Sequence, residues 1–152
     1  MITEIEQQTL DIDWFLTDGK YIGFMASAGG KLPDSVAKSA ENHKKLVHYF
    51  RNLPVVSDFT INPELNSVLI EIYRSKADER YLEDYISMAK KGLYSFDKNN
   101  FNHFLDGNYH LVASPVNPLT LEDLPVDISE ILIETQFQDK INQMLKMDIS
   151  SL

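Results

Sequence analysis

The sequence predicts an α+β fold, in which a small and mainly antiparallel sheet built on an N-terminal β-hairpin packs with about four helices. Two runs of aromatic and β-branched residues meet at Asp18-Gly19, and later apolar residues recur at the spacing of a helix face. The chain has 152 residues and shows no repeat, low-complexity tract or linker-like stretch. Residues 1–152 are therefore expected to form a single domain.

The hairpin is predicted over residues 12–26. Asp18-Gly19 favours a two-residue type I′ turn, because both central residues of that turn need positive φ angles. Such a turn would place Trp14 opposite Gly23 on the neighbouring strand. Both strands carry apolar residues on both faces, so we expect the hairpin to be covered on both sides.

Four helices are expected from apolar periodicity and from residues typical of helix ends. The first runs from Asp34 until Pro54, which has no amide hydrogen to donate. The second begins at Asn62-Pro63-Glu64, where an N-cap, a proline and a carboxylate follow one another. Its apolar stripe then slips in phase, so a break is predicted at residues 75–78, before a third helix that ends near Gly92.

The last helix has the strongest local signal for its start. Asp127 and Glu130 form a capping-box pattern, and Val126 can pack on Ile131 in the following turn. Its apolar side is predicted to continue to Leu145.

Short strands are expected between the third and the last helix. Brief apolar runs at residues 93–96, 109–113 and 119–121 are separated by Asp, Asn, Gly and Pro residues. Pro115 and Pro118 cannot donate to a sheet ladder, so the segment around them is expected at a sheet edge or in a loop.

The composition excludes several classes of protein. With 23 Asp and Glu against 14 Lys and Arg, the formal charge of −9 disfavours nucleic acid as a ligand. The chain has no cysteine, so disulfides, thiolate zinc sites and a cysteine nucleophile are excluded. No apolar run is long enough for a membrane span, and a cytoplasmic location is expected.

Residues 27–31, Ser-Ala-Gly-Gly-Lys, invite comparison with a phosphate-binding loop. A Walker A motif needs glycine where Met25 stands and serine or threonine where Leu32 stands, so that motif is absent. A tight turn from strand to helix is the favoured interpretation. Contact of its amides with an anion or with a partner's backbone is the alternative.

No metal, cofactor or catalytic residue is predicted. His43 and His48 are five residues apart, whereas helical zinc pairs use spacings of three or four. His43 and His110 are expected as hydrogen-bonded residues in or near the core, since His43 lies within the apolar stripe of its helix and His110 alternates with apolar strand neighbours. No Gly-x-Ser-x-Gly pattern is present.

Two groups of residues are candidate binding sites. Asp78, Glu79, Glu83 and Asp84 crowd the start of the third helix, where carboxylates also suit the helix dipole. If they act together, they are expected to form an acidic face for a basic protein. Three residues distant in the sequence are candidates for a pocket: Trp14, Tyr21 and His110.

The opening of the chain resembles that of small, mostly uncharacterised bacterial cytosolic proteins, some of them found at toxin-immunity loci. The resemblance is carried by the D-x-D-W-F-x-x-D block at residues 11–18, by Ile22-Gly23 and by residues 27–33, with later support from Pro118-Leu119 and Leu124-Pro125. It implies a small protein without a cofactor and with an immunity role.

Two hypotheses about function follow. The first is a non-enzymatic protein-binding module, in particular an immunity protein that neutralises a basic toxin. The alternative is a small enzyme or ligand-binding domain whose site is assembled from residues distant in the sequence. A structural role in a homo-oligomer is a third alternative, and neither nucleic acid nor a membrane is expected as a partner.

Overall fold

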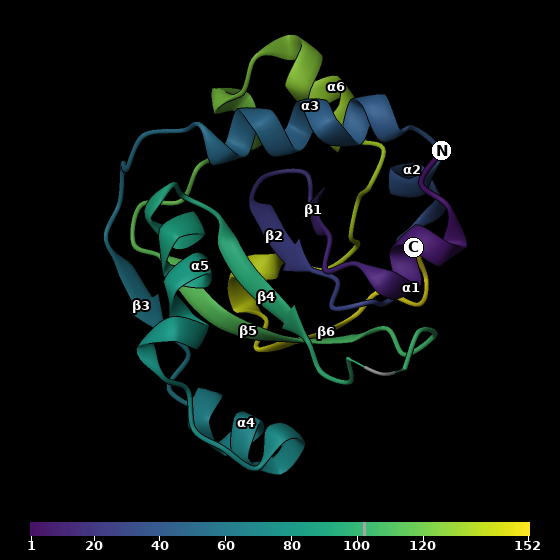
Figure 1. Ribbon diagram of the computed structural model, residues 1–152. Coiled ribbons are helices and arrows are strands. Elements are labelled where there is room, and N and C mark those ends of the chain that lie inside the picture. The colour runs from purple at the N-terminus through teal and green to yellow at the C-terminus, as the bar shows by residue number, and fades with distance from the viewer. Residues whose placement is uncertain (102) are drawn as a thin grey trace.

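The computed structural model describes residues 1–101 and 103–152 and contains one curled, mixed β-sheet (Figure 1). The strands are β1 (Asp13–Thr17), β2 (Ile22–Ala26), β3 (Phe59–Ile61), β4 (Tyr94–Lys98), β5 (Asn108–Pro115) and β6 (Lys146–Asp148). Their order is β1-β2-β4-β5-β3, and β6 also pairs with β5. The predicted α+β class is confirmed.

The sheet is mixed rather than mainly antiparallel, because β4 runs parallel to β2 while all other pairs are antiparallel. Between these two strands the chain crosses over through four helices and returns to the end of the sheet from which β2 started. β4 and β5 are neighbours, and their register places Asp97 directly across from His110.

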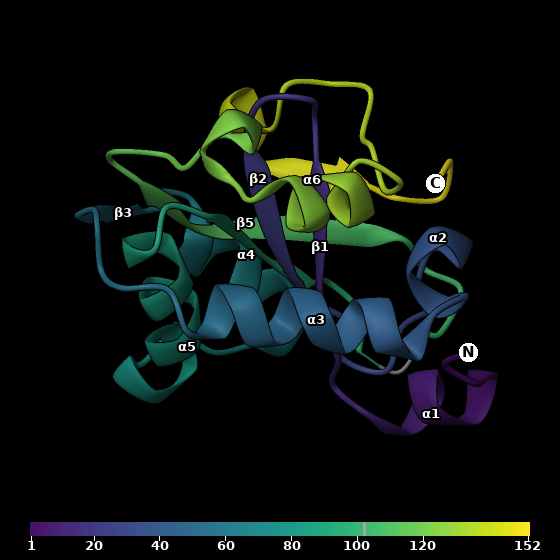
Figure 2. The same ribbon diagram turned by 90° about the horizontal axis from the view of Figure 1, so that it is seen from above.

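Helices lie on both sides of the sheet (Figures 1 and 2). They are α1 (Glu4–Thr9), α2 (Asp34–Ala37), α3 (Ala40–Arg51), α4 (Leu65–Tyr73), α5 (Glu79–Lys90) and α6 (Val126–Leu132), with short 3-10 turns at Leu121–Asp123 and Ile141–Gln143. Within the part of the chain that the structure describes, no helix is both long and apolar enough to cross a membrane.

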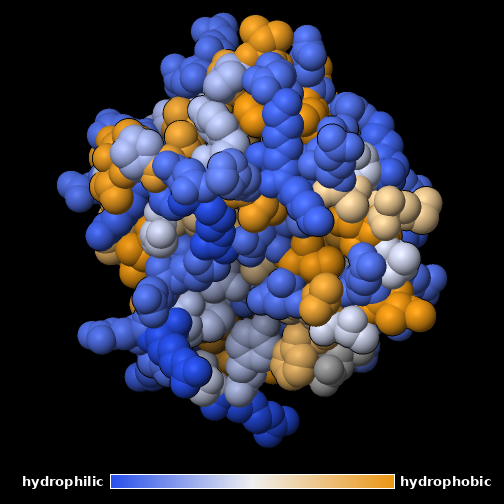
Figure 3. All heavy atoms as spheres, turned by 45° about the horizontal axis from the view of Figure 1, so that its top comes forward, coloured by the Kyte–Doolittle hydropathy of each residue, from blue (hydrophilic) through white to orange (hydrophobic). Residues whose placement is uncertain are grey.

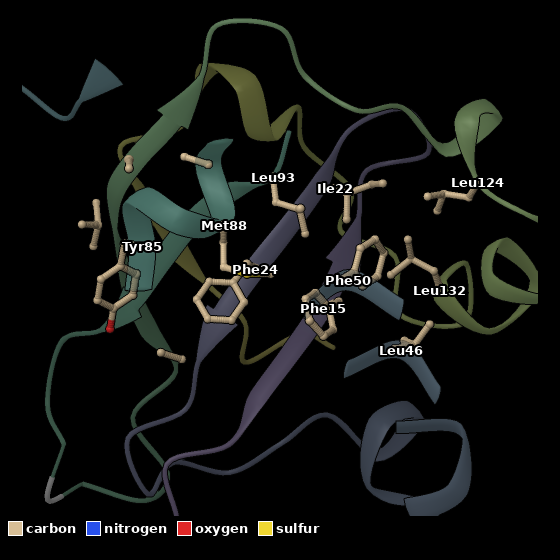
Figure 4. Close-up of a cluster of buried hydrophobic side chains, with 14 of the residues drawn as sticks. Phe15, Ile22, Phe24, Leu46, Phe50, Tyr85, Met88, Leu93, Leu124 and Leu132 are labelled. Atoms are coloured by element: carbon tan, nitrogen blue, oxygen red, sulfur yellow. The ribbon is translucent and has the colours of Figure 1, made fainter. Parts of the chain in front are cut away.

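The two faces of the sheet carry separate apolar cores. On one face, side chains of β1, β2 and β5 pack with those of α3, α4, α5 and α6. Figure 4 shows the part of this core between the hairpin and α3, α5 and α6. Phe15 and Phe50 lie at its centre, with ring centroids 4.5 Å apart and almost no exposed surface. Complete burial of one such ring stabilises the fold by about 2–3 kcal/mol.

The second core surrounds Trp14, which is fully buried. Its indole Nε1–H donates to the Tyr109 hydroxyl over 3.2 Å, and the two rings meet edge to face. The C-terminal segment covers this side, with Ile141 and Met147 among its buried residues. The hairpin is therefore covered on both faces, as its apolar pattern predicts.

The register of the hairpin differs from the expected one by two residues. Trp14 pairs with Met25 rather than Gly23, because the loop contains four residues instead of two. The Asp18 carboxylate accepts hydrogen bonds from the amides of Lys20 and Tyr21, at 2.9 and 2.7 Å. This side-chain cap stabilises a longer loop and competes with the type I′ turn.

The long first helix is divided into α2 and α3. Ser39 has an extended conformation, and its hydroxyl accepts from the Asn42 amide at 3.1 Å, which starts α3. The predicted break after α4 is confirmed: Arg74 is left-handed, and Asp78 caps α5. Gly92, with a φ of 97°, follows the end of α5 as expected.

The last helix is much shorter than predicted. α6 begins after Pro125 and ends at Leu132, while Val126 is 72% exposed and therefore forms no staple. The backbone that follows α6 pairs with the edge of β1. The Thr17 amide donates to the Thr135 carbonyl, and the Thr17 carbonyl accepts from the Phe137 amide. Pairing with a strand satisfies those groups in place of further helical turns.

Three elements have no counterpart in the prediction: α1, β3 and β6. Conversely, residues 119–121 form no strand, although Thr120 makes an isolated bridge with Tyr21. β3 and β6 are only three residues long, and each is held by its pairing to β5. Such short strands depend on their neighbours more than on their own composition.

Candidate functional site

Helix α5 carries the acidic group that the sequence suggests as a partner surface, but the structure gives its members different roles. Asp78 is the N-cap of α5, and its carboxylate accepts from the Tyr81 amide at 2.7 Å. Asp84 forms an ion pair with Arg51, in which the guanidinium also binds Asp13 at 2.6 Å. These two carboxylates are therefore used within the fold.

Arg51 connects α5 to the first strand through two carboxylates. Hydrogen bonding to Asp84 raises the pKa of Arg51 further above its usual value, although burial opposes this effect. Burial raises the pKa of Asp13, and the hydrogen bond from Arg51 offsets part of that shift. The guanidinium also lies 5.3 Å from the centre of the Phe24 ring.

Glu79 and Glu83 remain on the surface of α5 and border a depression of about 670 Å³. Its complete lining is Val55, Glu79, Arg80, Glu83, Ile86, Ser87 and Lys90. Among residues 1–101 and 103–152, neither Glu79 nor Glu83 belongs to an ion pair. Figure 3 shows one face of the molecule, where hydrophilic side chains dominate and smaller apolar areas lie between them.

The inner side of α5 covers a buried polar cluster of four side chains from distant parts of the sequence. The Tyr81 hydroxyl lies 2.7 Å from Asp97 Oδ2 and 3.1 Å from His110 Nε2. His110 Nδ1 lies 2.8 Å from Asn99 Oδ1. Asp97 is 5% exposed and His110 is fully buried, whereas Tyr81 and Asn99 are partly exposed, so the centre of the cluster is closed to solvent.

Burial dominates the electrostatics of this cluster. It raises the pKa of Asp97 to about 6, while hydrogen bonds from Tyr81 and Tyr85 act in the opposite direction. Burial also lowers the pKa of His110 to about 4. Both shifts favour the neutral forms, which is the expected effect of removing a charge from water.

The three residues suggested for a pocket are not brought together. Trp14 lies in the core on one face of the sheet, and His110 lies under α5 on the other. Tyr21 borders a separate depression with Asp18 and Lys20. Trp14 and His110 therefore lie on opposite sides of the sheet, which the sequence alone does not show.

The glycine-rich turn uses its amides within the chain. Every backbone N–H from Ser27 to Leu32 donates to an internal acceptor, including the Asp11 carboxylate and the Gln7 side-chain carbonyl. A Cβ atom on Gly30 would lie 2.9 Å from the backbone carbonyl oxygen of Ser27, so close packing favours glycine there. The turn has the structural role that the sequence favoured, and its amides are not directed at an anion.

Within the described ranges 1–101 and 103–152, no three His, Asp or Glu side chains are grouped so that they could hold a metal ion. His43 hydrogen-bonds the Asp13 carbonyl at 2.6 Å, and His110 belongs to the buried cluster. The prediction that both histidines are hydrogen-bonded is confirmed.

Sequence reasoning missed Tyr81, Asp97 and Asn99 as members of a site. The one available signal was Asp97 itself, a carboxylate that follows the strand pattern of residues 93–96 without a turn residue between them. Charged residues are rarely buried without partners, so a carboxylate at such a position predicts a hydrogen-bond partner nearby.

The fold and these sites define a small α+β protein with a curled mixed sheet, a polar cluster centred on buried side chains and an open helix face. No protein-family model, curated protein or solved structure matches the chain.

Proposed function

We propose that this chain is a non-enzymatic protein-binding module and that its partner is a basic protein docking over α5. The observation that carries the proposal is the depression on the outer side of that helix. Glu79 and Glu83 stand there as exposed carboxylates outside any ion pair of the described residues, next to the apolar Val55 and Ile86. Protein interfaces commonly combine an apolar centre with charged groups that select the partner.

The overall charge of −9 supports a basic partner. Such a field accelerates encounter with a cationic protein and weakens as salt screens it. Arg80 and Lys90 also border the depression, so the docking surface of the partner is expected to carry acidic groups opposite these two residues. An immunity protein that neutralises a basic toxin is the particular role that fits this chemistry and the resemblance at the start of the chain.

The test is capture of proteins from the native host on the immobilised chain at low and high salt. We expect a basic protein that is retained at low salt and released at high salt. In E79Q/E83Q, binding should fall up to about thirtyfold, since each of the two exposed charge pairs contributes at most about 1 kcal/mol.

The matched control is E122Q/E130Q, which removes the same charge from two exposed residues outside α5. It should bind almost as well as the original chain, because only the overall charge changes. Equal binding of E79Q/E83Q and the original chain would refute docking over α5. Capture of no protein at either salt concentration would refute the binding role.

The alternative, a small enzyme or ligand-binding domain, has weaker support. The buried cluster supplies a carboxyl, a hydroxyl and an imidazole, which are groups suited to acid–base chemistry. However, His110 is fully buried and Asp97 is 5% exposed, so a substrate would reach them only after α5 moved away from the sheet.

A further inference from the structure

The polar cluster under α5 contains a hydrogen-bond chain whose direction depends on one proton. The Tyr81 hydroxyl has a single hydrogen and two neighbours at hydrogen-bond distance, Asp97 Oδ2 and His110 Nε2. At the far side of the imidazole, Nδ1 faces the carbonyl oxygen of Asn99 at 2.8 Å. Because a carbonyl oxygen only accepts, Nδ1 carries the hydrogen of the neutral ring and Nε2 has the lone pair.

This arrangement of His110 determines where the other hydrogens lie. Tyr81 must donate to Nε2, because that nitrogen is otherwise buried without a donor. The phenolic oxygen can then accept a hydrogen bond from Asp97, provided that the carboxyl is protonated. The chain therefore runs from Asp97 through Tyr81 and His110 to Asn99, and every member is satisfied.

With Asp97 ionised, the same four side chains form a complete chain in the opposite direction. Tyr81 then donates to the carboxylate, and His110 Nε2–H donates to the Tyr81 oxygen. Nδ1 becomes an acceptor, which the NH₂ group of Asn99 satisfies after a half-turn of its amide. Asn99 is partly exposed, so its side-chain amide has room to turn. The same exposure brings the amide into contact with water, with which the cluster can exchange a proton. The ring stays neutral in both forms, and only its tautomer changes.

The groups around the cluster favour protonation of the Asp97 carboxyl at a higher pH than is usual for aspartate. Burial has the largest effect on Asp97, and the negative charge of Asp11 acts in the same direction. Hydrogen bonds from Tyr81 and Tyr85 of α5 and from the backbone of Lys98 favour the ionised form. Tyr73 of α4 also faces Asp97, and burial and that carboxylate raise its pKa, so it stays neutral. The resulting pKa of about 6 for Asp97 places the change within the physiological range.

We propose that Asp97, Tyr81, His110 and Asn99 form a proton-linked clamp between α5 and the sheet, in which protonation of Asp97 reverses the hydrogen-bond chain and turns the Asn99 amide. The clamp joins α5 to β4, to β5 and to the segment that follows β4. Asn99 lies next to that strand end, so the turn of its amide carries the protonation state of a buried group to the surface.

The test is the tautomer of His110 in the ¹⁵N-labelled full chain. Two-bond ¹H–¹⁵N correlation spectra distinguish a ring with hydrogen on Nδ1 from one with hydrogen on Nε2 and from the imidazolium. We expect a neutral ring at about pH 5 with hydrogen on Nδ1, and a neutral ring at about pH 7.5 with hydrogen on Nε2. The exposed His48 and His103 serve as references within the same spectra.

The variant D97N separates the clamp from a general effect of pH. Its carboxamide can donate to Tyr81 at any pH, so His110 should keep hydrogen on Nδ1 throughout. The variant Y81F should remove the dependence of the tautomer on Asp97. An unchanged tautomer in the original chain would overturn the proposal, as would an imidazolium over this interval or a tautomer change that persists in D97N. The spectra of the original chain are decisive even if a variant fails to fold.

Discussion

Replacing Asp97 or His110 singly should give the protein opposite pH dependences of stability, although the two side chains lie in one cluster. The pKa of His110 falls from 6.5 to about 4 on folding, because the ring is buried. Its contribution to stability is therefore fully present above pH 6.5 and is lost as the pH falls through about 4. A lowering of this size corresponds to about 3 kcal/mol.

The contribution of Asp97 has the opposite sign. Its pKa rises from 3.8 to about 6 on folding, so its stabilisation is fully present below 3.8 and is lost as the pH rises through about 6. This change also corresponds to about 3 kcal/mol. The physical causes of each shift do not include the other residue, so each shift should survive the loss of its neighbour.

In the original chain the two contributions nearly cancel. Near pH 5 the folded cluster holds one proton on Asp97, and the unfolded chain holds one on His110, so folding takes up almost no net proton. The pair should therefore change the free energy of unfolding by less than about 1 kcal/mol between pH 4 and 7. The cancellation ends when either group is replaced.

The assay is urea unfolding followed by the fluorescence of Trp14, which is the single tryptophan and is fully buried. Relative to the original chain, D97N should lose about 2 kcal/mol between about pH 7.5 and pH 4.5, and H110Q should gain about as much. Taking differences from the original chain removes the titration of other carboxyls. Differences that are independent of pH, or of the same sign in both variants, would refute the reasoning.

Four further substitutions test the packing by urea unfolding. Y109F removes the acceptor of the buried Trp14 Nε1–H and should cost about 1–2 kcal/mol, whereas a cost near zero would contradict that hydrogen bond. G92A should cost about 1–3 kcal/mol, because its φ is 97° and the new Cβ would lie 2.7 Å from the Leu119 amide nitrogen; an unchanged midpoint would refute this. R51K should cost about 1–2 kcal/mol, because lysine lacks the forked guanidinium that binds Asp13 and Asp84 together. D84N should cost less than about 1 kcal/mol, because Asp84 is half exposed. A larger cost for D84N than for R51K would show that the ion pair with Asp13 is the weaker of the two.

The hairpin illustrates how much a local pattern can predict. Alternation of apolar residues places Trp14 and Leu16 on one face and Phe15 on the other, which the structure confirms. The pairing register was wrong, because Asp18 caps a four-residue loop with its side chain. Faces follow from the two-residue period of a strand, whereas register follows from the geometry of the loop.

The last helix shows the limit of local signals. The capping-box pattern at Asp127 and Glu130 and the apolar periodicity after it predict a long helix, but Asp127 pairs with Lys45 and the helix ends at Leu132. The free edge of β1 takes the following backbone, and Thr17 hydrogen-bonds on both sides of Gln136. The sequence of residues 133–137 does not show that an unpaired edge of β1 lies beside them in the folded chain.

The sequence by itself determined the α+β class, the hairpin, the break between α4 and α5, and the exposure of Glu79 and Glu83, because these depend on residues within a few turns or strand positions. Only the tertiary structure decided that Asp84 is held by Arg51 and that Asp97 stands opposite His110 beneath Tyr81. These contacts join residues 13 to 33 positions apart, and they depend on the register between β4 and β5 and on how α3 and α5 pack on the sheet. Spacing along the chain carries no information about that register and packing, so the buried cluster emerges from the fold rather than from any motif.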